Sequence, residues 1–315
     1  MPFAFIIRRV VTALITLFLA SVMVFGALLI VPGDPVQLLL GLDYNEDQYR
    51  AVQKQLGLDK PPLEQYAIWI SGLPRGHLGS SLSESRPVSE AIVARLPVTV
   101  PLILTSSLLA LMIALPTGIL AARRKGTLFD VGLVSFTQLG LAIPSFWLGL
   151  MFVVVFAVNL RWLPSGGWTA WSENPLGSIR SLILPVLTLA LGQAAGLVRM
   201  VRSSVLEVIN QDFVRTARSK GLLESDVMRK HILRNAWIQI LTLFGIQLGQ
   251  LLAGSIIVET VYQLPGLGAL GIKAVKSIDF PLVQGVVFVI ASVIVTINLI
   301  VDLLYGALDP RIRYE

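Results

Sequence analysis

Six long stretches without a charged side chain alternate with polar, charged segments along this sequence. Each stretch is 18 to 30 residues long, and about 20 apolar residues are enough for a helix to cross a bilayer. Only helices and closed barrels satisfy their backbone hydrogen bonds in lipid, and the stretches lack the two-residue alternation of barrel strands. We therefore predict six transmembrane helices, at Val10–Gly33, Leu96–Ala122, Val131–Leu160, Ser181–Val198, Asn235–Val258 and Phe280–Val301.

The composition agrees with an all-α, polytopic membrane protein. Of the 315 residues, 55% are hydrophobic and only 14% are charged, whereas a soluble domain carries about 25% charged residues. The net charge of +6 would suggest nucleic acid binding in a soluble protein, but here the accumulation of Lys and Arg in cytoplasmic loops explains it better. We therefore expect no nucleic acid partner. The absence of Cys excludes disulfides, thiol catalysis and Cys-ligated metals.

The distribution of basic residues predicts the orientation of the chain. If both termini are cytoplasmic, 15 of the 25 Lys and Arg residues lie on the cytoplasmic side. These are Arg8, Arg9, Arg123, Arg124, Lys125, Arg199, Arg202, Arg215, Arg218, Lys220, Arg229, Lys230, Arg234, Arg311 and Arg313. Most of the others lie in the segment Asp34–Arg95. Basic residues in such a long loop say little about orientation, because long loops cross the membrane largely regardless of charge.

Four segments follow from this topology. Residues 1–33 form a cytoplasmic anchor and the first transmembrane helix, and residues 34–95 form an extracytoplasmic subdomain. Within that subdomain we predict a helix at Asp43–Leu58, with Pro61-Pro62 after it. Residues 96–306 form a five-helix core, and residues 307–315 form a cytoplasmic tail.

A glycine-rich motif is the one sign of nucleotide binding. Gly266-Leu-Gly-Ala-Leu-Gly271 matches the spacing of the dinucleotide fingerprint, but that fingerprint follows a strand and opens a phosphate-binding helix. A membrane span precedes it here, and Ile272 occupies the place where a phosphate-binding loop has Lys. We therefore predict a glycine-rich external turn and no cofactor on this chain.

Candidate metal and catalytic residues are sparse. His77 and His231 are the only histidines, and we expect them on opposite sides of the membrane, so they cannot form a two-His metal site within one subunit. No predicted span has a carboxylate at its centre, and Glu259 and Asp302 lie at span ends, as interfacial or capping residues. Intramembrane acids mark the pathways of ion-coupled transporters. Their absence weakens the hypotheses of an ion-coupled transporter and of a membrane enzyme.

The polar segment between the fourth and fifth spans contains the most informative motifs. Leu206–Ser219 is a plausible short helix, and Gly221 stands where a helix often ends in a left-handed residue. A second helical stretch, Asp226–Trp237, leads into the fifth span. Composition alone would favour an ordinary solvated basic loop.

This segment, at about 203–234, resembles the EAA loop, the cytoplasmic coupling loop of ABC-importer permeases. Gly221, Ala217 and Leu233 take the places of the Gly, the second Ala and the Leu of that signature. Arg215, Thr216 and Arg234 depart from it in the manner of the peptide/nickel subfamily. The resemblance implies that these ten residues couple the chain to an ATPase: Arg215, Thr216, Ala217, Arg218, Lys220, Gly221, His231, Leu233, Arg234 and Asn235.

Further motifs extend the resemblance over essentially the whole chain. They are Val31–Pro35, Leu56–Pro61, Thr260–Gly268, Asp279–Pro281, Asn298–Tyr305 and Leu308–Arg313. Together they resemble the first permease subunit of the dipeptide/oligopeptide/nickel permease family. The resemblance implies a MetI-like ABC permease core of six transmembrane helices in the cytoplasmic membrane of a bacterium or archaeon.

The resemblance also implies the partners. A second, homologous permease would enclose the pathway, two ATP-binding subunits would carry ATP and Mg, and an extracytoplasmic solute-binding protein would deliver cargo. Small peptides are the expected cargo, and nickel chelates or glutathione are the alternatives. An ion-coupled secondary transporter would work without ATPase subunits, so the partners that co-purify with the chain separate these hypotheses.

Overall fold

The computed structural model describes residues 3–30, 34–40, 44–55 and 57–308. Parts of the predicted motifs, including Leu56 and the tail after residue 308, lie outside the described residues. The chain divides into two compact units. Unit 1 comprises Met1–Val11, Val100–Leu264 and Thr296–Glu315, and unit 2 comprises Thr12–Thr99 and Pro265–Val295. The unit that contains the segment 34–95 thus also includes parts of the first and last predicted spans.

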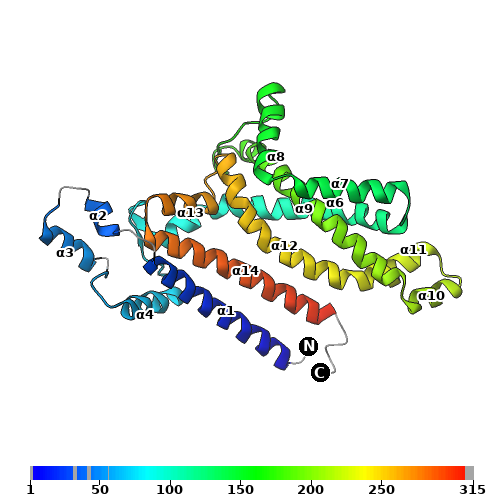
Figure 1. Cartoon of the computed structure of the whole chain (residues 1–315), viewed down its shortest axis with the longest axis horizontal. Helices are drawn as coiled ribbons and strands as arrows, with labels where there is room; N and C mark the ends of the chain where they lie inside the picture. Colours follow the sequence, from blue (N-terminus) through cyan, green and yellow to red (C-terminus); the bar gives the residue numbers. More distant parts are fainter. Residues whose placement is uncertain (1–2, 31–33, 41–43, 56, 309–315) are drawn as a thin grey trace. The chain divides into compact units, whose positions relative to one another are not determined.

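Almost all described elements are helices, and Figure 1 labels them. In chain order they are α1 (Phe3–Ile30), α2 (Pro35–Leu40), α3 (Glu46–Gln55), α4 (Pro62–Gly72), η1 (Leu73–Arg75), β1 (Ser80–Ser81), β2 (Arg86–Pro87), α5 (Val88–Val93), α6 (Leu96–Arg123), α7 (Leu128–Ala142), α8 (Ser145–Phe152), η2 (Val153–Asn159), α9 (Pro175–Ile209), α10 (Asp212–Ser219), α11 (Glu224–Asp226), η3 (Val227–Leu233), α12 (Arg234–Val261), α13 (Leu267–Lys276) and α14 (Phe280–Leu308).

Each of the six predicted spans has a helical counterpart. Within the described residues, five helical segments are long and apolar enough to cross a membrane: Ala4–Ile30, Leu96–Arg123, Pro175–Ile209, Glu224–Val261 and Phe280–Leu304. The sixth counterpart is a bent pair, Leu128–Ala142 with Ser145–Asn159. The prediction of a helical, multi-spanning fold is therefore confirmed.

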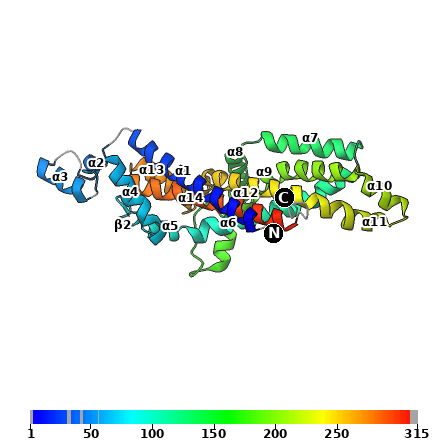
Figure 2. The same ribbon diagram turned by 90° about the horizontal axis from the view of Figure 1, so that it is seen from below.

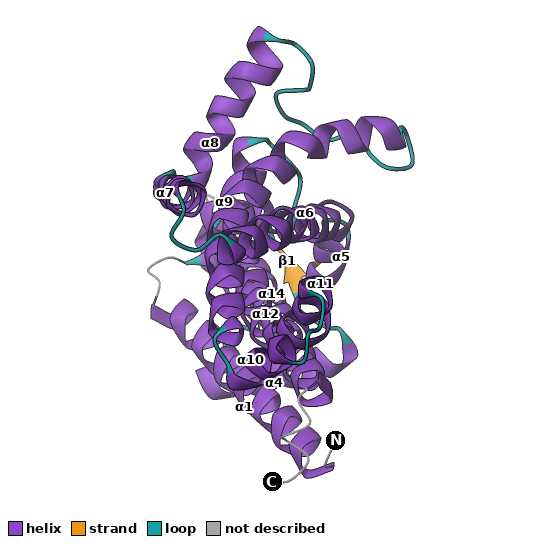
Figure 3. Ribbon diagram, turned by 90° about the vertical axis from the view of Figure 1, so that its right-hand side faces the viewer, coloured by secondary structure: helices purple, strands orange, loops and turns teal. Residues whose placement is uncertain are grey.

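The third span is broken at Pro144. The sequence predicted one span over Val131–Leu160, but α7 and the following helix meet at an angle of 94°, and Figure 3 shows the different directions of α7 and α8. Proline disfavours helical backbone in the residue before it, and Ile143 is accordingly extended, with φ −80° and ψ 119°. The expectation of a continuous third helix is wrong for this reason.

Two hydrogen-bonded contacts attach the two ends of the bent pair to α9. At the start of the bent pair, the Asp130 carboxylate accepts a hydrogen bond from Arg202 of α9. Just after the end of the pair, the carbonyl of Trp162 accepts a hydrogen bond from Arg180 of α9. Arg180 and Arg202 are 22 positions apart (202 minus 180) on one helix, which corresponds to roughly 33 Å. This separation is similar to the thickness of the hydrocarbon core, about 30 Å, and the bent pair is the sixth candidate span.

Helix α9 is much longer than the predicted fourth span. It has 35 residues, begins after the cap Asn174, whose side chain accepts from the N–H of Gly177, and continues to Ile209. The expected helix at Leu206–Ser219 is therefore wrong in its boundaries. Residues 206–209 end α9, the backbone is extended at Gln211, and α10 starts at Asp212.

Unit 1 is built on α9, which packs against α12, α7 and α8; Figures 1 and 2 both show α12 running beside it. Small and branched apolar side chains fill the contacts among α6, α9 and their neighbours, among them Ala110, Ala114, Ala190, Ala194, Leu197 and Val198. A Cβ atom on Gly118 of α6 would lie 2.8 Å from the carbonyl oxygen of Val198. Small residues at such positions let membrane helices approach closely.

Unit 2 is organised around Asp279, which is fully buried. Its Oδ2 accepts hydrogen bonds from the hydroxyl groups of Ser81 and Ser83 at 2.6 and 2.8 Å and from the N–H of Ser83 at 2.8 Å, and its Oδ1 accepts from the N–H of Leu282. These bonds join the β1–β2 hairpin to the start of α14. The hairpin is antiparallel, with Ser80 opposite Pro87 and Ser81 opposite Arg86.

The glycine-rich motif of unit 2 forms a helix and not the expected turn. Gly266 precedes α13, and the other two glycines lie inside that helix. A Cβ atom on Gly271 would lie 3.2 Å from a methyl group of Val286, so close packing explains this glycine better than backbone freedom does. The N–H of Leu267 donates to the hydroxyl of Thr99 at 2.8 Å, which satisfies one of the free N–H groups at the start of α13.

The other expectations for unit 2 and for the span ends hold in part. Helix α3 falls within the helix predicted at Asp43–Leu58, and Asn45 and Gln48 exchange backbone-to-side-chain hydrogen bonds at its start, as in a capping box. Asp302 pairs with Arg9 at 3.0 Å within unit 1. Glu259 lies near the end of α12 as expected, but it is fully buried in the protein.

The close contact at Gly118 leads to a stability prediction. Gly118→Val should destabilise the protein by about 1–3 kcal/mol, because the added atoms overpack the contact between α6 and α9. Gly192→Val is the matched control, since a Cβ atom on this α9 glycine would meet nothing within 4 Å. Thermal denaturation of both variants in detergent tests this, and equal melting temperatures would contradict the packing described for Gly118.

Candidate coupling surface

Helix α10 has one apolar face and one polar face. Val214 and Ala217 are buried in a cluster with Val205 and Val208 of α9, whereas Arg215, Thr216 and Arg218 are exposed. The same cluster includes Ala122 of α6, Val227, Met228 and Ile232 of η3, and Ala236 and Ile240 of α12. The apolar face therefore fixes α10 to the helices of unit 1, and its basic face is left for solvent or a partner.

Gly221 ends this helical segment as the sequence predicted. Its φ is +76°, a left-handed conformation that costs other residues free energy, and its N–H donates to the carbonyl of Arg218 at 2.9 Å. A Cβ atom on Gly221 would meet nothing within 4 Å. The site is therefore strained for other residues but open on its outer side.

Ion pairs on this surface are exposed. Arg218 binds Glu224 at 2.8 Å, Arg215 lies 3.7 Å from Asp212, and Lys230 lies 3.4 Å from Asp226. Exposed pairs of this kind contribute little to stability. The hydrogen bond from Arg218 to Glu224 raises the pKa of the Arg218 guanidinium above its ordinary value, so this side chain stays charged.

The predicted coupling residues that follow Gly221 lie on and after the π-helical turn η3. Leu233 packs against the buried cluster around Ile232, and His231 is half-buried. Arg234 and Asn235 are exposed, and the Asn235 amide donates to the carbonyl of His231 at 2.6 Å. Single π-helical turns are frequent at functional sites. The structure thus brings both groups of predicted residues to one end of unit 1 (Figure 1), where α9 ends and α12 begins.

An ion pair that the sequence analysis missed joins this end to α7. Both side-chain oxygens of Asp130 accept hydrogen bonds from Arg202, at 2.6 and 2.7 Å, and Oδ2 also accepts from the N–H of Gly126 at 3.0 Å. The Asp130 side chain is only 4% exposed. This bidentate pair, which we call the α7–α9 clasp, links the connection between α6 and α7 to the last turns of α9. Asp130 stands just before the apolar run, and nothing in the sequence alone pairs it with Arg202.

A polar groove between α9 and α12 was also missed. Its volume is about 660 Å³, and it is lined by residues such as Arg199, Ser203, Glu207, Gln239 and Thr242. The Glu207 carboxylate accepts from the Gln239 amide at 2.9 Å. Polar side chains within membrane helices usually face a protein interior or a water-filled cavity, so the polar positions on these two helices were the available signal.

The described residues contain no group of three or more His, Asp or Glu side chains that could hold a metal ion. The surface therefore offers charge, a sharp turn and a rigid apolar attachment, which are properties of a docking surface.

The α7–α9 clasp leads to a second prediction. Asp130→Asn should lower the free energy of unfolding by about 3–5 kcal/mol, because removing one partner of a buried ion pair leaves the other charge uncompensated. Lys230→Gln is the control, since it breaks an exposed pair worth about 1 kcal/mol or less. Thermal denaturation of the purified chain measures both. Similar small losses in both variants would show that the clasp does not hold α7 to α9.

Comparisons with known proteins agree with this arrangement. Residues 114–314 match the family model of the binding-protein-dependent transport system inner membrane component, and residues 2–103 match the N-terminal model of such membrane components. The oligopeptide transport system permease protein AppB of Bacillus subtilis is 39% identical over 314 residues, with 99% of each chain covered. The glutathione transport system permease protein GsiC of Escherichia coli is 38% identical over 311 residues, again with 99% of each chain covered.

A solved structure shares the fold. A chain of the MetNI methionine ABC transporter, in an inward-facing conformation, is similar with a TM-score of 0.54 and 20% identity, over 69% of this chain and 96% of that one. The MetI-like permease fold predicted from the sequence is thereby confirmed. The two matching family models cover nearly the whole chain, and it belongs to the family of binding-protein-dependent transport system inner membrane components.

Proposed function

We propose that this chain is the transmembrane permease subunit of an ATP-driven importer of small peptides. The observation that carries the proposal is the amphipathic helix α10, which is fixed to unit 1 by Val214 and Ala217 and presents Arg215 and Arg218 outward. The proposal of a peptide cargo is based on relatives that match over nearly the whole chain and are named for oligopeptide and di/tripeptide transport. Glutathione is the second candidate, because a relative of similar identity is named for it, and nickel chelates are the third.

The proposed partners are those of a binding-protein-dependent importer. Two ATP-binding subunits, which carry ATP and Mg, dock on the surface formed by α10 and the residues around Gly221. A second, homologous permease completes the pathway, and an extracytoplasmic solute-binding protein delivers the cargo. The ten residues predicted from the sequence form the coupling site. Ala217 and Leu233 support it by packing in the apolar cluster beneath the exposed residues. The chain itself hydrolyses no ATP.

The proposed mechanism uses the rigid attachment of α10. Closure of the ATPase subunits moves α10, and the shared apolar cluster transmits the movement to α9 and α12. The α7–α9 clasp passes it to the bent third span, since Asp130 is held to Arg202 at both oxygens. The result is a two-state equilibrium between inward- and outward-facing forms, which nucleotide binding shifts from a distance.

In the proposed orientation both termini lie in the cytoplasm and the chain lies in the cytoplasmic membrane. An even number of spans places both termini on one side, and the ion pair between Arg9 and Asp302 at 3.0 Å supports this. Arg123 lies close enough to Glu224 for their charges to interact. The basic connection after α6 and the coupling surface therefore share one side, as the excess of Lys and Arg in cytoplasmic loops requires.

The orientation can be tested because the chain has no natural Cys. A Cys at the exposed Ser172, before α9, should react with an impermeant maleimide in intact cells, and a Cys at the exposed Ser225, in α11, should not. Both should react after permeabilisation, which controls for accessibility. Labelling of Ser225→Cys but not Ser172→Cys in intact cells would overturn the orientation.

The coupling role can be tested at Gly221. Gly221→Asp should leave insertion intact but reduce substrate-stimulated ATP hydrolysis and uptake in the reconstituted importer about fivefold or more, because left-handed backbone costs a non-glycine residue roughly 1 kcal/mol or more and coupling energies are of the same size. Before addition of the ATP-binding subunits, the purified chain should hydrolyse no ATP.

The matched control is Gly167→Asp, since Gly167 has a similar φ of +87° and equally open surroundings but lies in the connection between η2 and α9. Gly126 is a poor control, because its N–H belongs to the α7–α9 clasp. If Gly221→Asp transports at the rate of the unmodified importer, or if both variants lose the same activity, the coupling role of this surface is wrong.

A further inference from the structure

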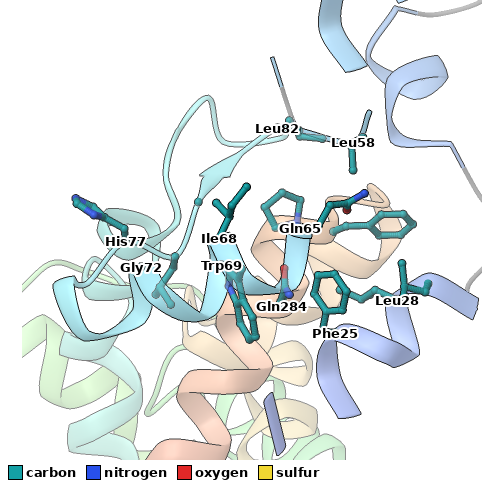
Figure 4. Close-up of a pocket in the computed structure, with 16 residues that line it drawn as sticks. Phe25, Leu28, Leu58, Gln65, Ile68, Trp69, Gly72, His77, Leu82 and Gln284 are labelled. Atoms are coloured by element: carbon teal, nitrogen blue, oxygen red, sulfur yellow. The ribbon is translucent and has the colours of Figure 1, made fainter. Parts of the chain in front are cut away.

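Unit 2 contains a cavity that the proposed function does not use. Its volume is about 520 Å³, within the usual range for small-molecule sites. Its walls come from the end of α1 with Phe25 and Leu28, from α4 with Ile68 and Trp69, and from the start of α14 with Gln284. Figure 4 shows Trp69 and Gln284 side by side next to Phe25, with Leu58 and Leu82 across the cavity.

Two hydrogen-bond donors in the wall have no partner. The indole N–H of Trp69 and the amide nitrogen of Gln284 are both buried, and neither has a hydrogen-bond partner among the described residues. The Gln284 residue is only 9% exposed. Leaving buried donors unsatisfied costs free energy. A ligand with an acceptor oxygen next to Trp69 and Gln284 would satisfy both donors.

The rest of the lining excludes a charged ligand group. Among the described residues that line the cavity there is no Asp, Glu, Lys or Arg, and most of this wall is aliphatic or aromatic. His77 is exposed, and Figure 4 places it at the edge of the site, away from Trp69 and Gln284. Because a buried charge needs a counter-charge or several hydrogen bonds, the ligand must be apolar and uncharged where it enters the cavity.

The position of the cavity indicates where such a ligand comes from. It lies at the end of one candidate membrane span, Ala4–Ile30, and at the beginning of another, Phe280–Leu304, so it is level with a boundary of the hydrocarbon core. Trp69 of α4 stacks on Phe25, Tyr66 contacts Phe25 edge to face, and the Tyr66 hydroxyl is hydrogen-bonded to Ser21 at 2.8 Å. Aromatic side chains with a polar end are typical of this interfacial level.

We propose that this cavity binds a glycerophospholipid, with one acyl chain among the apolar residues and its ester carbonyl accepting hydrogen bonds from Trp69 and Gln284. A short peptide also has carbonyl acceptors, but it brings two charged termini for which the lining offers no counter-charge. The bound lipid joins α4 to α1 and α14. This proposal does not depend on the identity of the transported cargo.

The test compares two synthetic lipids on the purified full-length chain after removal of bound lipid by detergent washing. Diacyl phosphatidylcholine should raise the melting temperature, and the dialkyl ether analogue, which lacks the ester carbonyls, should raise it clearly less. In the double variant Trp69→Phe with Gln284→Leu, the two lipids should have the same small effect. Trp237→Phe, which alters an exposed Trp of α12, should behave like the unmodified chain.

Native mass spectrometry before washing gives a second readout. One glycerophospholipid should co-purify with the chain, with an occupancy several-fold lower in the double variant. The double variant should melt no lower than the lipid-free unmodified chain, because it removes unsatisfied donors and little volume. The proposal is overturned if the diacyl and ether lipids stabilise the chain equally, if occupancy is equal in the double variant, or if a peptide occupies the site.

Discussion

The packing of α9 against α6, α7, α8 and α12 is the interaction on which unit 1 depends. Because no water is available in the hydrocarbon core, each helix satisfies its own backbone, and what remains to be fixed is how the helices approach one another. Small residues along α9 and α6 allow that approach, as where Gly118 of α6 lies against the backbone carbonyl of Val198. At 35 residues, α9 is long enough to pass beyond the hydrocarbon core. The same helix therefore organises the membrane core and carries the apolar cluster that holds α10.

This dual role connects α10 to the spans. The buried cluster under α10 contains residues from α6, α9, η3 and α12, so movement of α10 cannot be confined to a loop. The α7–α9 clasp adds the third span, which is connected to α6 only through residues 124–127 and is bent by 94° at Pro144. A broken helix with one end held firmly by Asp130 and Arg202 can pivot at Pro144 more easily than an unbroken one. Unit 2 holds its own core through Asp279, independently of these contacts.

The sequence predicted well what depends on local pattern. The uncharged runs located the five long candidate spans and the bent helix pair, and the left-handed Gly221 after α10 was expected from its place in the motif. The predictions from the sequence were wrong or missing where contacts between distant parts of the chain determine the structure. The turn expected at Gly266–Gly271 is the helix α13, because Gly271 is needed for packing on Val286. The boundary near Leu206 was misplaced because charged residues do not end a helix that leaves the membrane. The pairing of Asp130 with Arg202, 72 positions away, has no local signal.

In the proposed importer, α10 and the residues around Gly221 form the surface on which an ATP-binding subunit docks. Site-specific crosslinking tests it most directly, since the chain has no natural Cys. A Cys at the exposed Ser219 should form a crosslink to an ATP-binding subunit in the assembled importer, with a yield that changes when nucleotide is added, and a Cys at Ser172 should not. If Ser219→Cys forms no crosslink in an assembly that hydrolyses ATP and transports its substrate, α10 is not the docking surface.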